Sequence, residues 1–194
     1  ACGTGGLETP QGLAAAKDQV DNVLGKLRRK YKEYGINERP FVVVKADNGS
    51  QGLGMASVRD AKELDDADGP VRLQMRQARP DREVSGLIVQ EGVPTCERVN
   101  QALAEPVVYM IDRYVVGGFY RVHAQRRADE NLNAPGQVFV PLAFAEAAQL
   151  PKPGVKPGAS APNRFYMYGV VGRLAMLAAS YELEASDPQA EIYE

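Results

Sequence analysis

The chain has 194 residues, with 23 lysine and arginine residues against 25 aspartate and glutamate residues and a net charge of −2. This balance argues against a protein that binds nucleic acid through its overall charge. The two cysteines, Cys2 and Cys96, are too few and too far apart in sequence for a disulfide framework. No apolar run approaches the roughly 18 residues of a membrane-spanning helix, and no signal-peptide pattern opens the chain. A cytoplasmic protein is the default, and the start at Ala1 instead of Met suggests a processed or excised chain.

In the first half of the chain, one long helix is followed by short strands. The small, Gly-rich residues 1–12 predict an N-terminal loop. A helix is predicted over 13–34, because apolar residues recur there with helical spacing, namely Val20, Val23, Leu24, Leu27 and Tyr31. The runs at 40–45 and 55–58 predict short strands. A polar helix or helical turn is expected over 59–68, ended by Gly69 and Pro70.

The second half is dominated by strands. A buried strand is predicted at 87–91, a short helix at 95–104, and a hairpin of strands 106–112 and 119–124 that turns at Gly117 and Gly118. A polar loop, a strand at 138–143, a Pro-rich loop at 150–162 and a helix at 165–183 follow. The predicted apolar face of that helix contains Val170, Leu174, Leu177 and Tyr181. Because strands neighbour strands, we predict an α+β fold of mainly antiparallel sheets with flanking helices.

The segment from Lys45 to Gly54 is the most informative motif. Its three glycines let backbone N–H groups approach an anion closely. It is not a Walker A loop, since no Gly-Lys-Ser/Thr ends it. A Gly-rich loop between two strands is typical of a flap over nucleotide phosphates, and Lys45 is placed to reach them. A tight hairpin with a solvated lysine is the alternative, and the loop by itself leaves both open.

Two later segments could complete a site. The strand ending Gln90-Glu91-Gly92-Val93 exposes backbone groups that can bond an adenine edge, although it could equally be an ordinary strand end. Arg121 lies in an apolar strand and needs a partner, which could be a carboxylate, a phosphate or Asp112 across the hairpin. The following loop offers oxygen donors suited to Mg²⁺ or an amino-acid substrate, from Asp129, Glu130, Asn131 and Asn133.

Other chemistries receive little support. His123 is the sole histidine, so a zinc site of His/Cys type is disfavoured, and we expect a packed residue. No Gly-x-Ser-x-Gly elbow supports a catalytic triad. The recurring arginines at 72, 76, 79 and 82 would form one helical face, which we interpret as solvent-facing or as a cover for a nucleotide cleft instead of a nucleic-acid site.

The motifs in this order resemble the proteobacterial glutamate–cysteine ligases of ATP-grasp type. The resemblance runs from about Val20 to the final helix, and its most specific part is the block from Tyr109 to Gly136. It implies an ATP-grasp-like fold with a nucleotide-flap subdomain over 13–92 and a lid and substrate subdomain over 93–194. The family has a sizeable region before the Lys45 strand, so we expect an upstream N-terminal region to lie outside this chain.

The resemblance also implies an activity. The chain would be an ATP-dependent carboxylate–amine ligase that joins glutamate and cysteine into γ-glutamylcysteine through an acyl phosphate, the first step of glutathione synthesis. ATP and Mg²⁺ would be required, with no nucleic-acid or membrane partner, and a homo-oligomer stays open. The alternatives are an ATP-grasp ligase with other amino-acid substrates and a nucleotide-binding fragment without activity of its own.

Residue roles follow from the same resemblance. Lys45 would bind the ATP phosphates under a cover formed by Asn48, Gly49, Ser50, Gly52 and Gly54. Gln90, Glu91 and Val93 would line the adenine pocket. Arg121, catalytic together with Lys45, would hold a substrate carboxylate or the transferring phosphoryl group. Asn131 and Asn133 would close over the substrate, and Asp47 would contribute to Mg²⁺ binding. A carboxylate–x–Asn pair after the lid, expected to bind two Mg²⁺ ions, is not evident.

Overall fold

The structure is a computed structural model that describes residues 6–47, 52–77, 84–142 and 164–187. The chain divides into two compact units, the first made of Ala1–Leu103 and His123–Gln137, the second of Ala104–Val122 and Val138–Glu194. Each of the two subdomains predicted from sequence was one continuous stretch of chain. In the structure each unit consists of two stretches, because residues 123–137 belong to the first unit although they follow part of the second in the sequence. Within the described ranges no helix has the length and apolar character needed to cross a bilayer.

The first unit begins with helix α1 (Pro10–Glu33), whose apolar stripe is confirmed: Val20, Leu24 and Leu27 are buried. The helix starts three residues earlier than predicted, so residues 10–12 do not belong to the N-terminal loop. The reason is an N-cap, since Thr9 Oγ1 accepts a hydrogen bond from the Gly12 amide at 3.0 Å. Pro10 also suits the first helical position, where its missing N–H costs no hydrogen bond.

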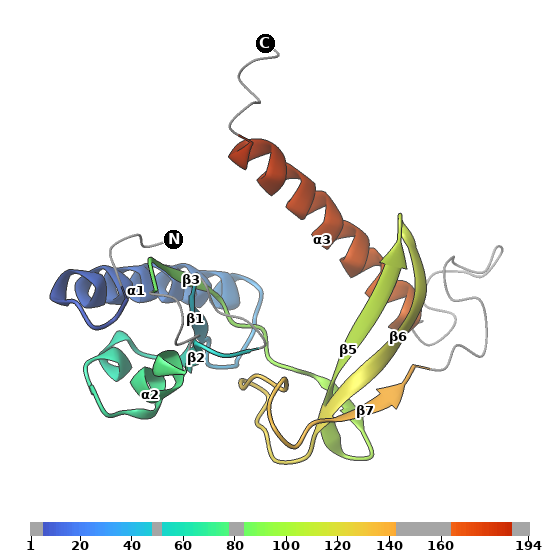
Figure 1. Cartoon of the computed structure of the whole chain (residues 1–194), viewed down its shortest axis with the longest axis horizontal. Coiled ribbons are helices and arrows are strands. Elements are labelled where there is room, and N and C mark those ends of the chain that lie inside the picture. The colour runs from blue at the N-terminus through green and yellow to red at the C-terminus, as the bar shows by residue number, and fades with distance from the viewer. Residues whose placement is uncertain (1–5, 48–51, 78–83, 143–163, 188–194) are drawn as a thin grey trace, which may run out of the picture. The chain divides into compact units, whose positions relative to one another are not determined.

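Helix α1 covers one face of a three-stranded antiparallel sheet in the order β2-β1-β3 (Figure 1). The strands are β1 (Val42–Ala46), β2 (Met55–Val58) and β3 (Leu87–Glu91). In β1 the alternate residues Val42, Val44 and Ala46 are buried in the core that α1 completes. All three strands lie where the sequence predicts them, within two residues.

Two short helices follow β2. A 3₁₀ helix, η1 (Ala61–Leu64), is capped by Asp60, and α2 (Pro70–Arg76) begins at the Gly69-Pro70 pair. The prediction that the arginine face of this region is solvent-exposed is wrong for Arg72. That side chain is buried and donates to Glu8, at 3.1 Å, and to the Leu64 carbonyl. Helix α2 ends at Arg76, and residues 79 and 82 lie outside the described residues.

A second sheet has the order β4-β5-β6-β7. Its strands are β4 (Glu97–Val99), β5 (Ala102–Ile111), β6 (Tyr114–His123) and β7 (Val138–Pro141). The helix predicted over 95–104 is therefore wrong. Asn100 and Gln101 adopt positive φ values of 48° and 70°, which make a tight turn between β4 and β5 instead of a helix.

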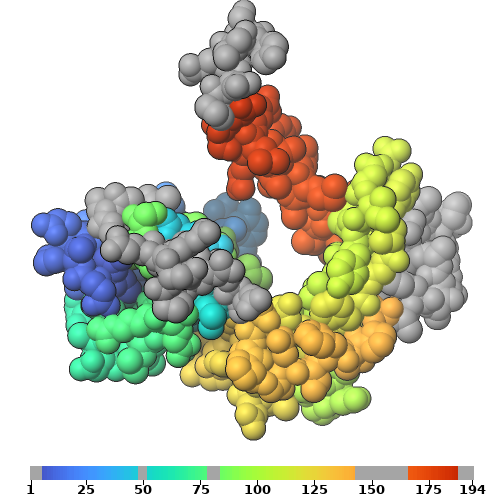
Figure 2. Space-filling view, viewed as in Figure 1, coloured from blue at the N-terminus to red at the C-terminus, as the bar shows by residue number. Residues whose placement is uncertain are grey.

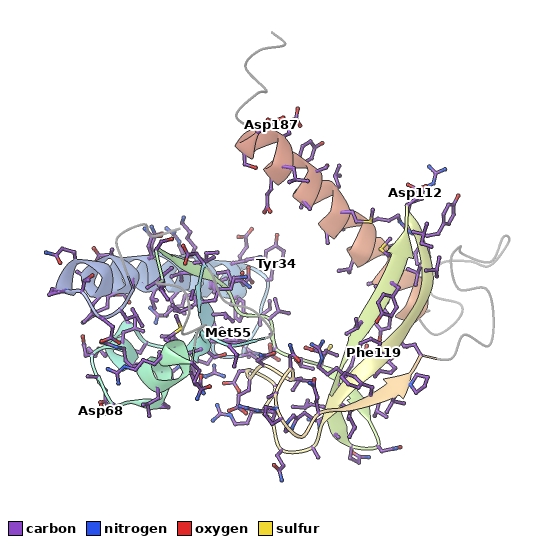
Figure 3. All side chains as sticks on the ribbon, viewed as in Figure 1. Tyr34, Met55, Asp68, Asp112, Phe119 and Asp187 are labelled. Carbon is purple, nitrogen blue, oxygen red and sulfur yellow. The ribbon has the colours of Figure 1, made fainter. Side chains whose placement is uncertain are left out.

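The hairpin turn also lies elsewhere than predicted. The chain reverses at Asp112 and Arg113, where Asp112 has a φ of 52°, and Gly117 and Gly118 lie inside β6. Figure 3 labels Asp112 at the tip of this hairpin. A Cβ atom on Gly118 would lie 2.5 Å from the Val107 carbonyl oxygen, so this glycine allows the two strands to approach closely.

Helix α3 (Arg164–Ser186) is confirmed, starting one residue before the prediction and ending three after it. Its N-terminal part contacts the β5–β6 hairpin through glycines: Cβ atoms there would meet Val115 at Gly169 and Met110 at Gly172. The predicted apolar face is not packed, since Leu174, Leu177 and Tyr181 are more than half exposed. Figure 2 shows the C-terminal part of α3, in red, standing clear of β5 and β6. The predicted loop at 150–162 lies outside the described residues.

Candidate functional site

Lys45 and Gln90, two residues predicted to bind nucleotide, lie on the same face of the first sheet. Cross-strand partners point to the same side of a sheet. Val43 pairs with Gln90 and Ser57, and Lys45 pairs with Met55. These residues alternate with the buried Val42 and Val44, so their face is the one that α1 does not cover. The structure thus gathers a lysine and an amide on the sheet face opposite α1.

Glu91 and Val93 are placed differently from Gln90. Glu91 pairs with Val42 and therefore points to the α1 side, where Lys30 Nζ lies 3.4 Å from its carboxylate. The side chain of Val93 is 78% exposed. Between them, the Gly92 amide donates to the Phe41 carbonyl at 2.9 Å. A contribution of Glu91 to an adenine site would therefore come from its main chain, as expected for backbone groups at the end of a strand.

The structure also brings the end of the Gly-rich segment against the loop of residues 124–137. Both border a cavity of about 330 Å³ in the first unit. Its wall includes Gly52, Met55 and Ser57 on one side, Asn131 and Asn133 on another, and Gln74 of α2. Gly54 helps to close the β1–β2 hairpin, because its carbonyl accepts the Ala46 amide at 2.8 Å. Asn48, Gly49 and Ser50 lie outside the described residues.

The loop is tied to β2 through Asp129. The Arg59 guanidinium lies 2.6 Å from the Asp129 carboxylate, and that of Arg127 lies 2.9 Å away. Ser57 Oγ donates to the Asp129 carbonyl. Burial acts to raise the pKa of Asp129, but hydrogen bonds from Arg59 and Arg127 outweigh it and lower that pKa. The sequence suggested Asp129 as an oxygen donor for Mg²⁺ or a substrate; here its carboxylate is occupied by two arginines.

Sequence reasoning did not identify Arg59 as part of the site. Besides Asp129, this side chain donates to the Arg39 carbonyl at 2.9 Å and lies 5.2 Å from the centre of the Phe41 ring. Its position directly after β2 gave no signal in the sequence, because an arginine at the end of a strand can equally be solvated. Which acceptor it finds depends on a loop 70 residues away.

His123 is packed, as predicted. It is 4% exposed, and its Nε2 lies 3.0 Å from the Pro135 carbonyl oxygen. Leu132, between the two asparagines, is fully buried. The histidine therefore supports the fold of the loop that carries Asn131 and Asn133.

Arg121 belongs to the second unit, on β6. It forms an ion pair with Glu105 of β5, not with Asp112, which lies at the hairpin turn. Its Nε is buried, and no hydrogen-bond partner for it is found in the described part of the chain. Arg121 therefore retains one unsatisfied donor beside its carboxylate partner, which is a costly arrangement unless another acceptor joins it.

The described residues contain no cluster of side chains that could hold Mg²⁺ without ligands from a bound molecule. Asp47, the predicted contributor, accepts a hydrogen bond from Ser85 Oγ. No group of three or more histidine, cysteine, aspartate or glutamate side chains gathers there in a way that could hold a metal ion. A Mg²⁺ ion held by one or two carboxylates and the phosphates of a bound nucleotide would need no such group.

These features define the class of protein: an α+β chain of antiparallel sheets with flanking helices, in which a Gly-rich hairpin meets an Asn-bearing loop. The family comparison is more specific. The sequence model that describes the glutamate-cysteine ligase family matches residues 1–183 of this chain. The chain belongs to the glutamate-cysteine ligase family.

A solved structure agrees with this family. The chain is similar to a protein from Methylobacillus flagellatus KT that is named "putative gamma-glutamylcysteine synthetase", with 46% sequence identity and a TM-score of 0.74. The similarity covers 96% of this chain and 44% of that one, so this chain spans less than half the length of its structural relative. No curated protein sequence matches the chain.

Proposed function

We propose that this chain supplies the nucleotide-binding and substrate-closing parts of an ATP-dependent glutamate–cysteine ligase of ATP-grasp type. The observation that carries the proposal is the family match over residues 1–183. The 46% identity with the Methylobacillus flagellatus protein supports it. So does the placement of Lys45 and Gln90 on one sheet face beside the Gly-rich hairpin.

The proposed reaction has two steps. A γ-carboxylate oxygen of glutamate attacks the γ-phosphorus of ATP, which releases ADP and leaves an acyl phosphate. The amine of cysteine then attacks the acyl carbon, expels phosphate and loses a proton, which leaves the amide bond of γ-glutamylcysteine. Negative charge develops on phosphoryl oxygens in the first step, and on the acyl oxygen and the departing phosphate in the second. Lysine, arginine, N–H donors and a Mg²⁺ ion bound with ATP would stabilise this charge without a protein nucleophile.

The chain offers such groups. Lys45 would neutralise the ATP phosphates, and Gln90 with the main chain of 91–93 would border the adenine. Arg121, with its unsatisfied Nε, would bind a substrate carboxylate or the transferring phosphoryl group after exchanging its bond to Glu105. Asn131 and Asn133 border the cavity at the end of the Gly-rich segment.

Lys45→Ala tests the proposal directly. We expect this variant to lose ADP formation in the presence of ATP, glutamate and cysteine, because the phosphates lose their fixed cation. The matched control is Lys26→Ala, a lysine on α1 away from the proposed site, which should retain the activity of the unsubstituted protein. Unchanged ADP release in Lys45→Ala would contradict the phosphate assignment.

Calorimetry and substrate exchange separate the remaining alternatives. Absence of Mg·ATP binding would contradict the ATP-dependent proposal as a whole. Mg·ATP binding without turnover would favour a nucleotide-binding fragment. ADP formation with another amino-acid pair, but not with glutamate and cysteine, would favour a ligase of different specificity.

A further inference from the structure

The side chain of Asn131 is fully engaged with main-chain atoms. Its Nδ2 donates to the carbonyl oxygens of Gly52 and Asn133, both at 3.2 Å, and its Oδ1 accepts the Asn133 amide at 3.0 Å. A primary amide offers two donor hydrogens and one acceptor oxygen. Here both hydrogens and the oxygen are used inside the protein. One bond fixes the end of the Gly-rich segment, and the other two fix the loop itself.

Gly52 is matched to this asparagine. Its φ of +78° is one that glycine adopts readily and other residues do not. A Cβ atom on Gly52 would lie 2.0 Å from Asn131 Nδ2 and 3.0 Å from the Asn133 carbonyl oxygen. Any other residue would therefore displace the amide that holds this position.

The loop that carries Asn131 is itself firmly anchored. The fully buried Leu132 adjoins Asn131, and Asp129 is held by Arg59 and by Ser57, at the two sides of the last residue of β2. A bond from Asn131 to Gly52 therefore connects the Gly-rich segment to a part of the loop that cannot easily shift. The geometry of the bond is set by the fold on both sides.

Unlike Asn131, Asn133 has a side-chain N–H group that is not used in a hydrogen bond within the described residues. Its Oδ1 accepts a hydrogen bond from Gln137 Nε2 at 3.2 Å. For its Nδ2, the described residues provide no hydrogen-bond partner, and Asn133 borders the cavity. An amide N–H in that position can donate to a carboxylate or phosphoryl oxygen of a bound molecule.

We propose that the two asparagines divide the work: Asn131 is a positioning residue that joins the Gly-rich segment to the loop, and Asn133 donates to the substrate. This inference rests on the proposed function. It replaces the symmetric expectation that both residues close over the substrate. Through Asn131, Gly52 and a substrate group held at Asn133 would be kept at a fixed separation, and such fixed placement of reacting groups is what phosphoryl transfer requires.

Amide hydrogen exchange, measured by NMR without nucleotide, tests the bond by which the Asn131 side chain fixes its own loop. Asn131→Ala removes the acceptor of the Asn133 amide, so we expect that amide to exchange at least about tenfold faster. Asn131→Asp retains an oxygen at the same place and should keep its exchange slow. Unchanged exchange in Asn131→Ala would overturn the anchoring of the loop by Asn131, on which the positioning role depends.

A double-mutant cycle tests the fit between Gly52 and Asn131. Gly35 is the control for backbone strain, because it has a similar φ of +67° and a Cβ atom added there would meet nothing within 4 Å. We expect Gly52→Ala to shift the folding equilibrium toward the unfolded state by at least about tenfold more than Gly35→Ala does. The loss of folding free energy caused by Gly52→Ala should be smaller in the Asn131→Ala background than in the unsubstituted protein. Equal effects of the two glycine substitutions, or strict additivity in the cycle, would overturn the proposed fit.

Steady-state kinetics test the division of roles. Asn131→Ala should lower kcat about 10- to 100-fold with KM values for ATP and glutamate within about twofold. Asn133→Ala should raise a substrate KM with a smaller effect on kcat. A purely stabilising role would lower the melting temperature of Asn131→Ala without this split, and would overturn the positioning role. If the unsubstituted protein binds no Mg·ATP, the proposed function and the positioning role both fail, whereas the double-mutant cycle still decides whether the link between Asn131 and Gly52 exists.

Discussion

Helices α1 and α3 have nearly the same length, 24 and 23 residues, but they are used in opposite ways. Helix α1 buries Ala16, Val20, Leu24 and Leu27 against the first sheet. Of the described residues of α3, only Gly169 is buried, whereas Leu174, Leu177 and Leu183 are each more than half exposed. An apolar pattern is thus enough to indicate a helix, but the stability it contributes depends on the surface that covers it.

The largest expected effect contrasts these two helices directly. Leu24→Ala should destabilise the protein by about 2–5 kcal/mol, because it opens a cavity in a fully buried site. Leu177→Ala, on the half-exposed α3 surface, should change stability by no more than about 0.5 kcal/mol. Urea unfolding followed by circular dichroism measures both. Equal losses would show that α3 is as well packed as α1.

The second prediction concerns the ion pairs that hold the loop in the first unit. At pH 7, Asp129→Asn should cost about 1.5–3 kcal/mol, because it weakens hydrogen bonds to two charged arginines. The pKa of Asp129 is lowered in the folded protein, so its stabilisation is complete above its ordinary carboxyl pKa and is lost as pH falls through the folded-state pKa.

The difference between Asp129→Asn and the unsubstituted protein should therefore shrink below about pH 4. Asp68→Asn is the control, since Asp68 is 95% exposed and its ion-pair distance to Arg76 is 3.8 Å. Thermal unfolding between pH 3 and pH 7 provides the measurement. If the stability difference between Asp129→Asn and the unsubstituted protein did not change with pH, the ion pairs of Asp129 with Arg59 and Arg127 would not be its cause.

The third prediction tests how closely the strands of the second unit pack. Gly118→Ala should destabilise by about 1–3 kcal/mol, because the new Cβ would lie 2.5 Å from the Val107 carbonyl and 3.0 Å from Leu142. Gly117→Ala is the matched control in the same strand, with no atom within 4 Å. We expect it to be neutral, or to stabilise by less than about 1 kcal/mol. Thermal melting that ranks the two variants in reverse would contradict the strand arrangement.

The smallest effect concerns the contact between α3 and its own sheet. The hydroxyl oxygens of Tyr120 and Tyr168 lie 3.0 Å apart, and their rings meet edge to face. Tyr120→Phe should cost about 0.5–1.5 kcal/mol by removing one hydrogen bond. Tyr181→Phe, on the exposed part of α3, should cost nothing measurable. If both substitutions are neutral in urea unfolding, the tyrosine pair does not help to hold α3.

The errors of the sequence-based predictions share one physical origin. Gly117 and Gly118 predicted a turn, because glycine is common in two-residue hairpin loops. The turn lies instead at Asp112, and Gly118 is needed where β5 and β6 approach closely, a contact that no local pattern shows. A helix was likewise expected over residues 95–104, whereas Asn100 and Gln101 form a turn between strands.

The candidate site was predictable to different degrees. The apolar runs at 40–45 and 87–91 were enough to expect Lys45 and Gln90 near the ends of strands. That these two strands are neighbours in one sheet came from the structure. The partners of Arg59, Arg121 and Asn131 were not predictable in this way. They lie on other strands or loops, and for Asn131 the partner is a carbonyl 79 residues away.

By itself, the sequence determined helix α1, strands β1, β2 and β3, and the glycine-rich character of the hairpin between β1 and β2, because periodicity and glycine content are local properties of the chain. It also carried the resemblance to glutamate–cysteine ligases that the family match bears out. Only the tertiary structure decided three pairings. Asp129 is paired with arginines, the buried Arg72 forms an ion pair with Glu8, and the Asn131 side chain donates a hydrogen bond to the Gly52 carbonyl. Ion pairs and side-chain hydrogen bonds join residues through space, and their partners are fixed only when the fold has brought the segments together.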